Sequence, residues 1–167
     1  MPERRLTHVG ESGAARMVDV SGKDVTVRTA TATGRVLVSP EVVDLLRAGS
    51  VPKGDALAVA RIAGIQAAKR TPDLVPLCHP IAIHGVDVDL RVEDDAVHVA
   101  ATVRTADRTG VEMEALTCVA VAGLALVDMV KAVDRAATIT DVRVEHKSGG
   151  RSGEWRRTEG SSGASTP

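Results

Sequence analysis

Aromatic side chains are almost absent from this sequence of 167 residues. It contains no Phe, no Tyr and a single Trp, Trp155, near its end. Proteins that bind single-stranded nucleic acid usually stack the bases on aromatic side chains. The scarcity therefore argues against an RNA-binding domain. It also predicts that a purine ligand would be held by hydrogen bonds and aliphatic contacts.

Cysteine and net charge are also scarce. Two cysteines, Cys78 and Cys118, are too few for a disulfide scaffold, and we expect reduced thiols in a cytoplasmic protein. The formal net charge is −1, so no bulk field attracts the chain to nucleic acid or to a membrane. An anion site must therefore come from a local cluster of basic side chains.

Long apolar segments are missing as well. The N-terminus has no apolar signal-peptide core. The longest apolar run, from Ala115 to Val127, is interrupted only by Thr117 and is shorter than the ~20 residues that cross a bilayer. We expect this run to form a helix that is buried in the domain or at a subunit interface, without a membrane partner.

The composition that remains, 44% apolar and 26% charged, is typical of one globular domain. We expect a flexible segment over residues 1–16, a single domain over 17–155, and a disordered tail rich in Gly and Ser over 156–167.

Hydrophobic periodicity predicts the elements of the first half. Val25–Val38 alternates in polarity, which indicates a strand or a hairpin bent at Gly34. Helices are expected from Pro40 to about Gly49 and from Asp55 to about Arg70. Three prolines then predict a rigid extended loop over residues 71–80.

The second half is predicted as a hairpin, a helix and a strand. His84–Val92 and Val97–Val103 alternate on either side of a turn at Asp94-Asp95. A long helix should follow over about Val111–Val133, and a last strand over Ile139–Glu145. The order predicts an α+β ferredoxin-like sandwich, an antiparallel sheet with helices on one face. Its other face must be polar or covered by another subunit.

The predicted long helix has acidic residues at its start and a mixed pair at its end. Glu112 and Glu114 lie in the first turn, where the helix dipole favours carboxylates whether or not they have a further role. Asp128 and Lys131 share a face directly after an apolar stretch. They form either a structural ion pair or a partly desolvated acid/base pair.

Loop residues add further candidates. Cys78 and His79 lie between two prolines, but they are too few for a zinc site and the cysteine has no evident partner as a nucleophile. A structural histidine is therefore an equal alternative. Lys53 precedes a helix N-terminus, where anions bind, although most loop lysines are simply exposed.

Two more basic residues are candidate phosphate contacts. Lys147 begins KSGG, which has the composition of a phosphate-binding loop but not the GxxxxGK[ST] pattern, so a flexible linker is the alternative. Arg28 lies in the first predicted strand. There is no nicotinamide, flavin or P-loop fingerprint and no metal-ligand cluster. The whole set suits acid/base chemistry on a phosphorylated small molecule without a redox cofactor.

Several segments in one order also carry a family resemblance, from about Leu6 to Trp155. They are LTHV, ARMVDVS, Lys53-Gly54-Asp55, ARIAGIQAAKRT, PLCHP, TGVEMEALT, DMVKAVD and KSGG. On them the chain resembles the MoaC family, the cyclic pyranopterin monophosphate synthases of molybdenum cofactor biosynthesis. Arg151 stands where the family usually has Lys, and no departure removes a proposed catalytic group.

The resemblance implies a lyase that converts 3′,8-cyclo-7,8-dihydro-GTP to cyclic pyranopterin monophosphate and releases pyrophosphate. It implies Lys53, Lys131 and Asp128 as the catalytic residues of a catalytic domain over 17–155. The substrate-binding residues it implies are Leu77, Cys78, His79, Glu112, Met113, Glu114, Lys147 and Arg28. It also implies a homohexamer, a trimer of dimers with sites at subunit interfaces.

These roles suit the side chains. Two lysines near one substrate disfavour each other's charge, so one could act as a base while Asp128 keeps the other protonated. Mg²⁺ would suit the departing pyrophosphate, but no ligand cluster requires it. A non-catalytic purine-nucleotide-binding module of this fold, or an inactive paralogue, is the alternative.

Overall fold

The computed structural model describes residues 9, 10 and 12–158. The predicted flexible residues 1–8 and 11 and the tail residues 159–167 lie outside this part. The elements follow one another as β1 Thr26–Leu37, α1 Pro40–Ala48, α2 Ala56–Ala68, α3 Thr71–Leu74, β2 Gly85–Val92, β3 Ala96–Asp107, α4 Glu112–Val130, β4 Thr138–Ser148 and β5 Trp155–Arg156.

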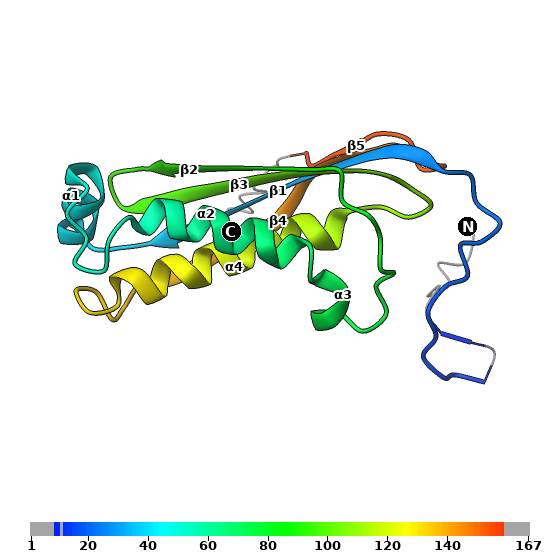
Figure 1. Cartoon of the computed structure of the whole chain (residues 1–167), viewed down its shortest axis with the longest axis horizontal. Coiled ribbons are helices and arrows are strands. Elements are labelled where there is room, and N and C mark those ends of the chain that lie inside the picture. Colours follow the sequence, from blue (N-terminus) through cyan, green and yellow to red (C-terminus); the bar gives the residue numbers. More distant parts are fainter. Residues whose placement is uncertain (1–8, 11, 159–167) are drawn as a thin grey trace, which may run out of the picture.

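The strands form one antiparallel sheet in the order β2-β3-β1-β4-β5. Apart from the short edge strand β5, this is the strand–helix–strand–strand–helix–strand arrangement of the ferredoxin-like fold. Helices α2 and α4 lie side by side on one face of the sheet (Figure 1). The predicted α+β sandwich is therefore confirmed, including the hairpin of β2 and β3.

Alternation along the strands separates the two faces of the sheet. On β1, Ala30, Ala32 and Val36 are buried beneath the helices. Their neighbours Thr31 and Thr33 point to the other face, because successive strand residues alternate. That face is polar: Arg35 bonds Glu93 and Asp95, Arg104 bonds Asp87, and Thr31 bonds Thr102.

Of the two alternatives for the segment Val25–Val38, the structure shows the strand: β1 is continuous, and its pairing with β4 is irregular between Thr33 and Arg35, at Gly34. A Cβ at Gly34 would lie 2.7 Å from Cγ1 of Val119 on α4 and 3.2 Å from Cγ2 of Val142 on β4. The glycine therefore permits the close approach of α4 to the sheet.

Residues 71–80 differ from the prediction. Thr71–Leu74 form the short helix α3, and only the following residues form turns. Pro72 falls in its first turn, where the missing N–H costs no hydrogen bond. Pro72 therefore supports a helix start, where the sequence reasoning took it as part of an extended loop.

Helix α4 is the central helix of the domain. By length and composition it could cross a membrane, but half of its apolar stretch is buried within the fold, as in the core helix of a soluble protein. Its outward side remains apolar, and Leu124 is 61% exposed. On the neighbouring α2, Val59 and Ile62 are exposed as well. The helical face of the domain therefore presents uncovered apolar side chains.

Candidate active site

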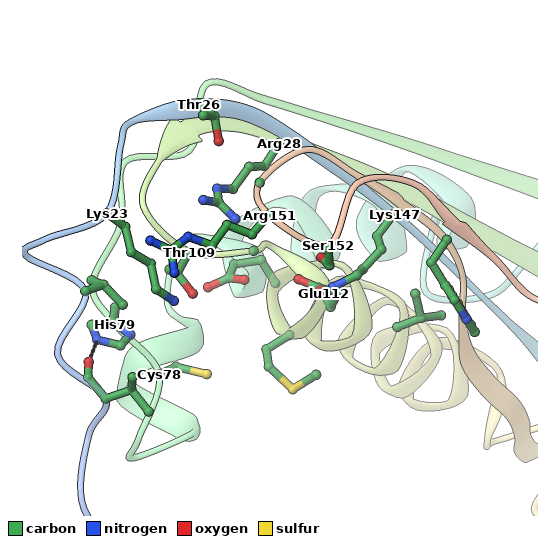
Figure 2. A pocket seen from close by; sticks show the side chains of 18 of the residues that line it. Lys23, Thr26, Arg28, Cys78, His79, Thr109, Glu112, Lys147, Arg151 and Ser152 are labelled. Carbon is green, nitrogen blue, oxygen red and sulfur yellow. Dashed lines mark hydrogen bonds and ion pairs between the residues drawn. The ribbon is translucent and has the colours of Figure 1, made fainter. Parts of the chain in front are cut away.

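A cavity of about 1010 Å³ opens beside the N-terminus of α4. Its walls come from the segment before β1, the loop after α3, the start of α4, and the turn between β4 and β5 (Figure 2). All eight predicted substrate-binding residues line it: Arg28, Leu77, Cys78, His79, Glu112, Met113, Glu114 and Lys147. Folding thus brings together residues that are up to 119 positions apart in the sequence.

Two carboxylates on the first turn of α4 have different states. Glu112 accepts a 2.7 Å bond from Nζ of Lys147, so this carboxylate is paired across the cavity wall. Glu114 is only 3% exposed, and burial raises its pKa to about 7, with a further contribution from the charge of Glu112. Glu114 can therefore offer or accept a proton near neutral pH.

The loop of Cys78 and His79 is joined to the segment before β1. Nε2 of His79 lies 2.6 Å from the carbonyl oxygen of Val18, which can only accept, so the bond requires the proton on Nε2. Burial, and then the charge of Glu114, raises the pKa of the Cys78 thiol. A protonated thiol is a poor nucleophile, so Cys78 is better suited to packing or weak hydrogen bonding.

One end of the cavity is cationic. Lys23, Arg28 and Arg151 extend toward one another there (Figure 2). Among the residues described, no carboxylate forms an ion pair with any of the three. Nε of Arg28 donates to the carbonyl oxygen of Asp107 at 2.9 Å, which fixes the guanidinium group. Three converging cations without an acidic partner are suited to a polyphosphate.

The segment KSGG is not a flexible linker: Lys147 and Ser148 end β4, and Gly149 and Gly150 begin the turn toward β5. Gly149 and Gly150 have φ values of 94° and 72°, in the region that favours glycine. A Cβ at Gly150 would overlap Nη1 of Arg28. The turn therefore leaves the space that the guanidinium group of Arg28 occupies.

The three predicted catalytic residues form a separate cluster, which we call the lysine cluster. Nζ of Lys131 lies 2.6 Å from Oδ1 of Asp128, and Nζ of Lys53 lies 3.3 Å from Oδ2 and 2.8 Å from the carbonyl oxygen of Asp128. The hydrogen bond from Lys131, followed by that from Lys53, lowers the pKa of Asp128. Asp128 and Lys131 were expected to be partly desolvated, but in the single chain the side chain of Asp128 is 57% exposed.

The lysine cluster does not line the cavity of its own chain. Met113, at the cavity, and Lys131, in the cluster, are at opposite ends of α4. Eighteen residues of α-helix separate them by roughly 27 Å. One substrate cannot contact both groups in a single subunit.

The predicted set lacks several residues of the cavity, among them Lys23 and Trp155. Lys23 lies in a segment without a motif for anion binding. Arg151 begins Arg151-Ser152-Gly153, which has the composition of a phosphate-binding loop but not the GxxxxGK[ST] pattern. Trp155 also lines the cavity, so the chain does offer an aromatic surface to a ligand. No three His, Cys, Asp or Glu side chains of the described residues are arranged to hold a metal ion.

The fold and this charged cavity define a ferredoxin-like α+β protein with a site for a small anionic ligand. The chain belongs to the MoaC family, whose sequence model matches residues 17–150. It is 72% identical to the cyclic pyranopterin monophosphate synthase of Streptomyces coelicolor over 94% of the chain and 92% of that protein. It is also 72% identical to the enzyme of that name from Nocardioides sp., over 92% and 96%.

A mycobacterial relative is more distant. Cyclic pyranopterin monophosphate synthase 2 of Mycobacterium tuberculosis is 59% identical over 91% of each chain. The family match and these relatives identify the chain as an enzyme, a lyase of molybdenum cofactor biosynthesis.

Proposed function

We propose that the chain converts 3′,8-cyclo-7,8-dihydro-GTP to cyclic pyranopterin monophosphate with release of pyrophosphate. The observation that carries this proposal is the meeting of all eight predicted binding residues in one cavity. The names of the relatives supply the product. The identity of the substrate is inferred from the resemblance of the sequence motifs to those of the family.

The cationic end of the cavity suits the triphosphate. Lys23, Arg28 and Arg151 would neutralise its charge, which makes pyrophosphate a better leaving group. Glu114, with its pKa near 7, would hydrogen-bond the reacting ring system in either protonation state. We expect no redox cofactor, and Mg²⁺ would bind mainly through the phosphates rather than in a protein cage.

The lysine cluster would carry out the proton transfers. Asp128 lies between two amines, so it can hold one as an ammonium donor while the other acts as a base. Exposed charges interact weakly in water, and catalysis by this cluster requires a drier environment. We propose that a second subunit provides it.

The apolar side of the helices supports such pairing. The outward side of α4 runs from Met113 at the cavity, through Leu124, to Asp128 and Lys131. In a two-fold symmetric contact the same surface of both subunits meets. The N-terminal end of α4 in one subunit would then face the C-terminal end of α4 in the partner. The cavity of one subunit would then receive the lysine cluster of the other. We propose this pair as the dimer unit of a homohexamer, a trimer of dimers.

We also propose a cytoplasmic location. Cys78 and Cys118 are both free thiols in the structure, which is the state expected in a reducing compartment.

The direct test is conversion of the cyclised substrate by purified protein, followed by pterin fluorescence after oxidation. Wild-type protein should form the pterin, and Lys53→Ala and Lys131→Ala should remain folded with turnover lowered by about 100-fold or more. Wild-type turnover in both variants would contradict the acid/base roles. Nucleotide binding without any conversion by the wild-type protein would favour the non-catalytic module.

A further inference from the structure

The only aromatic side chain of the protein lies where a ligand can reach it. Trp155 lines the cavity and is 40% exposed. In the β4–β5 ladder it pairs with Lys147, so both side chains point to the same face of the sheet. Lys147 contacts Glu112 of α4, which identifies that face as the helical one. Trp155 thus projects into the cavity side of the domain.

The ring of Trp155 has one occupied face. The guanidinium carbon of Arg157 lies 5.6 Å from the ring centroid, in the range of a cation–π contact. Trp155 is not a member of the buried core, and much of its surface remains in contact with solvent. A large exposed aromatic surface at the wall of a cavity is what a planar ligand ring would cover.

The two ends of the cavity differ in chemistry. Trp155 lies on β5, at the edge of the sheet, and Val144 on the neighbouring β4 also lines the cavity, whereas Lys23 and Arg28 gather at the cationic end. Trp155 pairs with Lys147, and Lys147 pairs with Ala30, so Trp155 lies two strands from β1, ~10 Å across the sheet, and two residues, ~7 Å, along it from Arg28. A molecule that joins a flat ring to phosphates matches this division.

We propose that Trp155 stacks on the guanine-derived ring of the substrate, which places the triphosphate at Lys23, Arg28 and Arg151. The orientation of the bound nucleotide follows from it, with its ring toward β5 and its phosphates toward the start of β1. The identity of the ring rests on the proposed function. The stacking itself is tested by any guanine nucleotide that the cavity binds.

The single Trp makes binding directly observable. With no Tyr and no other Trp, the intrinsic emission of the protein comes from residue 155. GTP should quench this emission, because its base stacks on the indole. Inorganic tripolyphosphate should compete with GTP for the cavity but change the emission little.

Substitution of the ring separates stacking from phosphate binding. Trp155→Ala should weaken GTP binding, measured by calorimetry, by about 5- to 100-fold, and leave the affinity for tripolyphosphate unchanged. Trp155→Phe keeps an aromatic face and should restore most of the affinity. A ring that only supports the fold would weaken both ligands together in Trp155→Ala. Equal weakening of both ligands would overturn the proposal. So would equal GTP affinities in the alanine variant and the wild type, or a wild type that binds no GTP.

Turnover distinguishes this inference from the proposed function. Trp155→Ala should raise KM for the cyclised substrate more than it lowers kcat. An unchanged KM would overturn the stacking and leave the proposed function standing. If the wild-type protein forms no pterin, the proposed function fails, and the GTP titrations still decide whether the ring stacks.

Discussion

At the residue scale, two glycines of the turn between β4 and β5 have nearly the same backbone and different surroundings. Gly150 has φ 72° and Gly153 has φ 63°. A Cβ at Gly150 would displace the guanidinium group of Arg28, whereas a Cβ at Gly153 would meet nothing within 4 Å. Alanine substitutions at these two positions can therefore distinguish the effect of backbone strain from the effect of displacing Arg28.

Both Gly150→Ala and Gly153→Ala should cost roughly 1–2 kcal/mol of stability, since each forces alanine into a left-handed conformation. Only Gly150→Ala should also weaken pyrophosphate binding, by roughly 10-fold, through the loss of a charge-assisted contact. Calorimetric titration of both variants checks this. Equal affinities would mean that the turn does not position Arg28.

Glu114 makes a pH-dependent contribution to stability. Its pKa is 4.5 in a free side chain and about 7 in the fold, so between these values the native state holds a proton that the unfolded state has lost. The contribution is fully present below pH 4.5 and is lost as pH rises through about 7. A shift of this size corresponds to about 3 kcal/mol.

Glu114→Gln removes the titrating group. Relative to the wild type, the variant should become more stable between pH 5 and pH 8, as measured by urea unfolding at several pH values. The same pH slope in both proteins would show that the carboxyl is not buried in solution.

At the scale of elements, the fold depends on the contact of α2 with α4. A Cβ at Gly64 would lie 2.9 Å from the carbonyl oxygen of Cys118, so the helices approach closely only because this residue has no side chain. Gly123 lies on the other side of α4, where a Cβ would make ordinary contacts at 3.4 Å with Ile139 and Val36.

These two helical glycines should respond with opposite signs. Gly64→Ala should lower the free energy of unfolding by about 1 kcal/mol, because overpacking outweighs the gain in helix propensity. Gly123→Ala should raise it by up to about 1 kcal/mol. Thermal and chemical unfolding of both variants measures the difference. Stabilisation by Gly64→Ala would mean that the helices can separate without cost.

Long elements with a regular hydrophobic pattern could be predicted from the sequence, whereas the contacts between elements could not. The alternation of β1 and the apolar run of α4 were sufficient to place both. The short elements α3 and β5 have too few residues to show a period, and β5 exists through its pairing with β4. The close contact that requires a glycine at position 34 could not be predicted, because Val119 lies far away in the sequence.

At the scale of the whole molecule, the cavity and the lysine cluster, which we propose to act on one substrate, lie at opposite ends of α4. Motif resemblance predicted the residues of both groups, because each group lies in short, recognisable segments. The helix predicted over Val111–Val133 already places Met113 and Lys131 roughly 27 Å apart in one chain. The sequence could not show that the cavity forms beside only one end of this helix. Lys23 and Trp155 were missed because only the folding of the sheet brings them to the cavity.

The central claim is that two subunits complete each site, and subunit mixing tests it most directly. Lys131→Ala lacks part of the lysine cluster, and the double variant Arg28→Ala/Lys147→Ala lacks part of the cavity. Each protein alone should be nearly inactive. Co-expressed and purified through two different tags, the mixed assembly should recover about a quarter of the wild-type activity, since random pairing leaves that share of sites intact. A mixed assembly as inactive as its two parents would contradict the account.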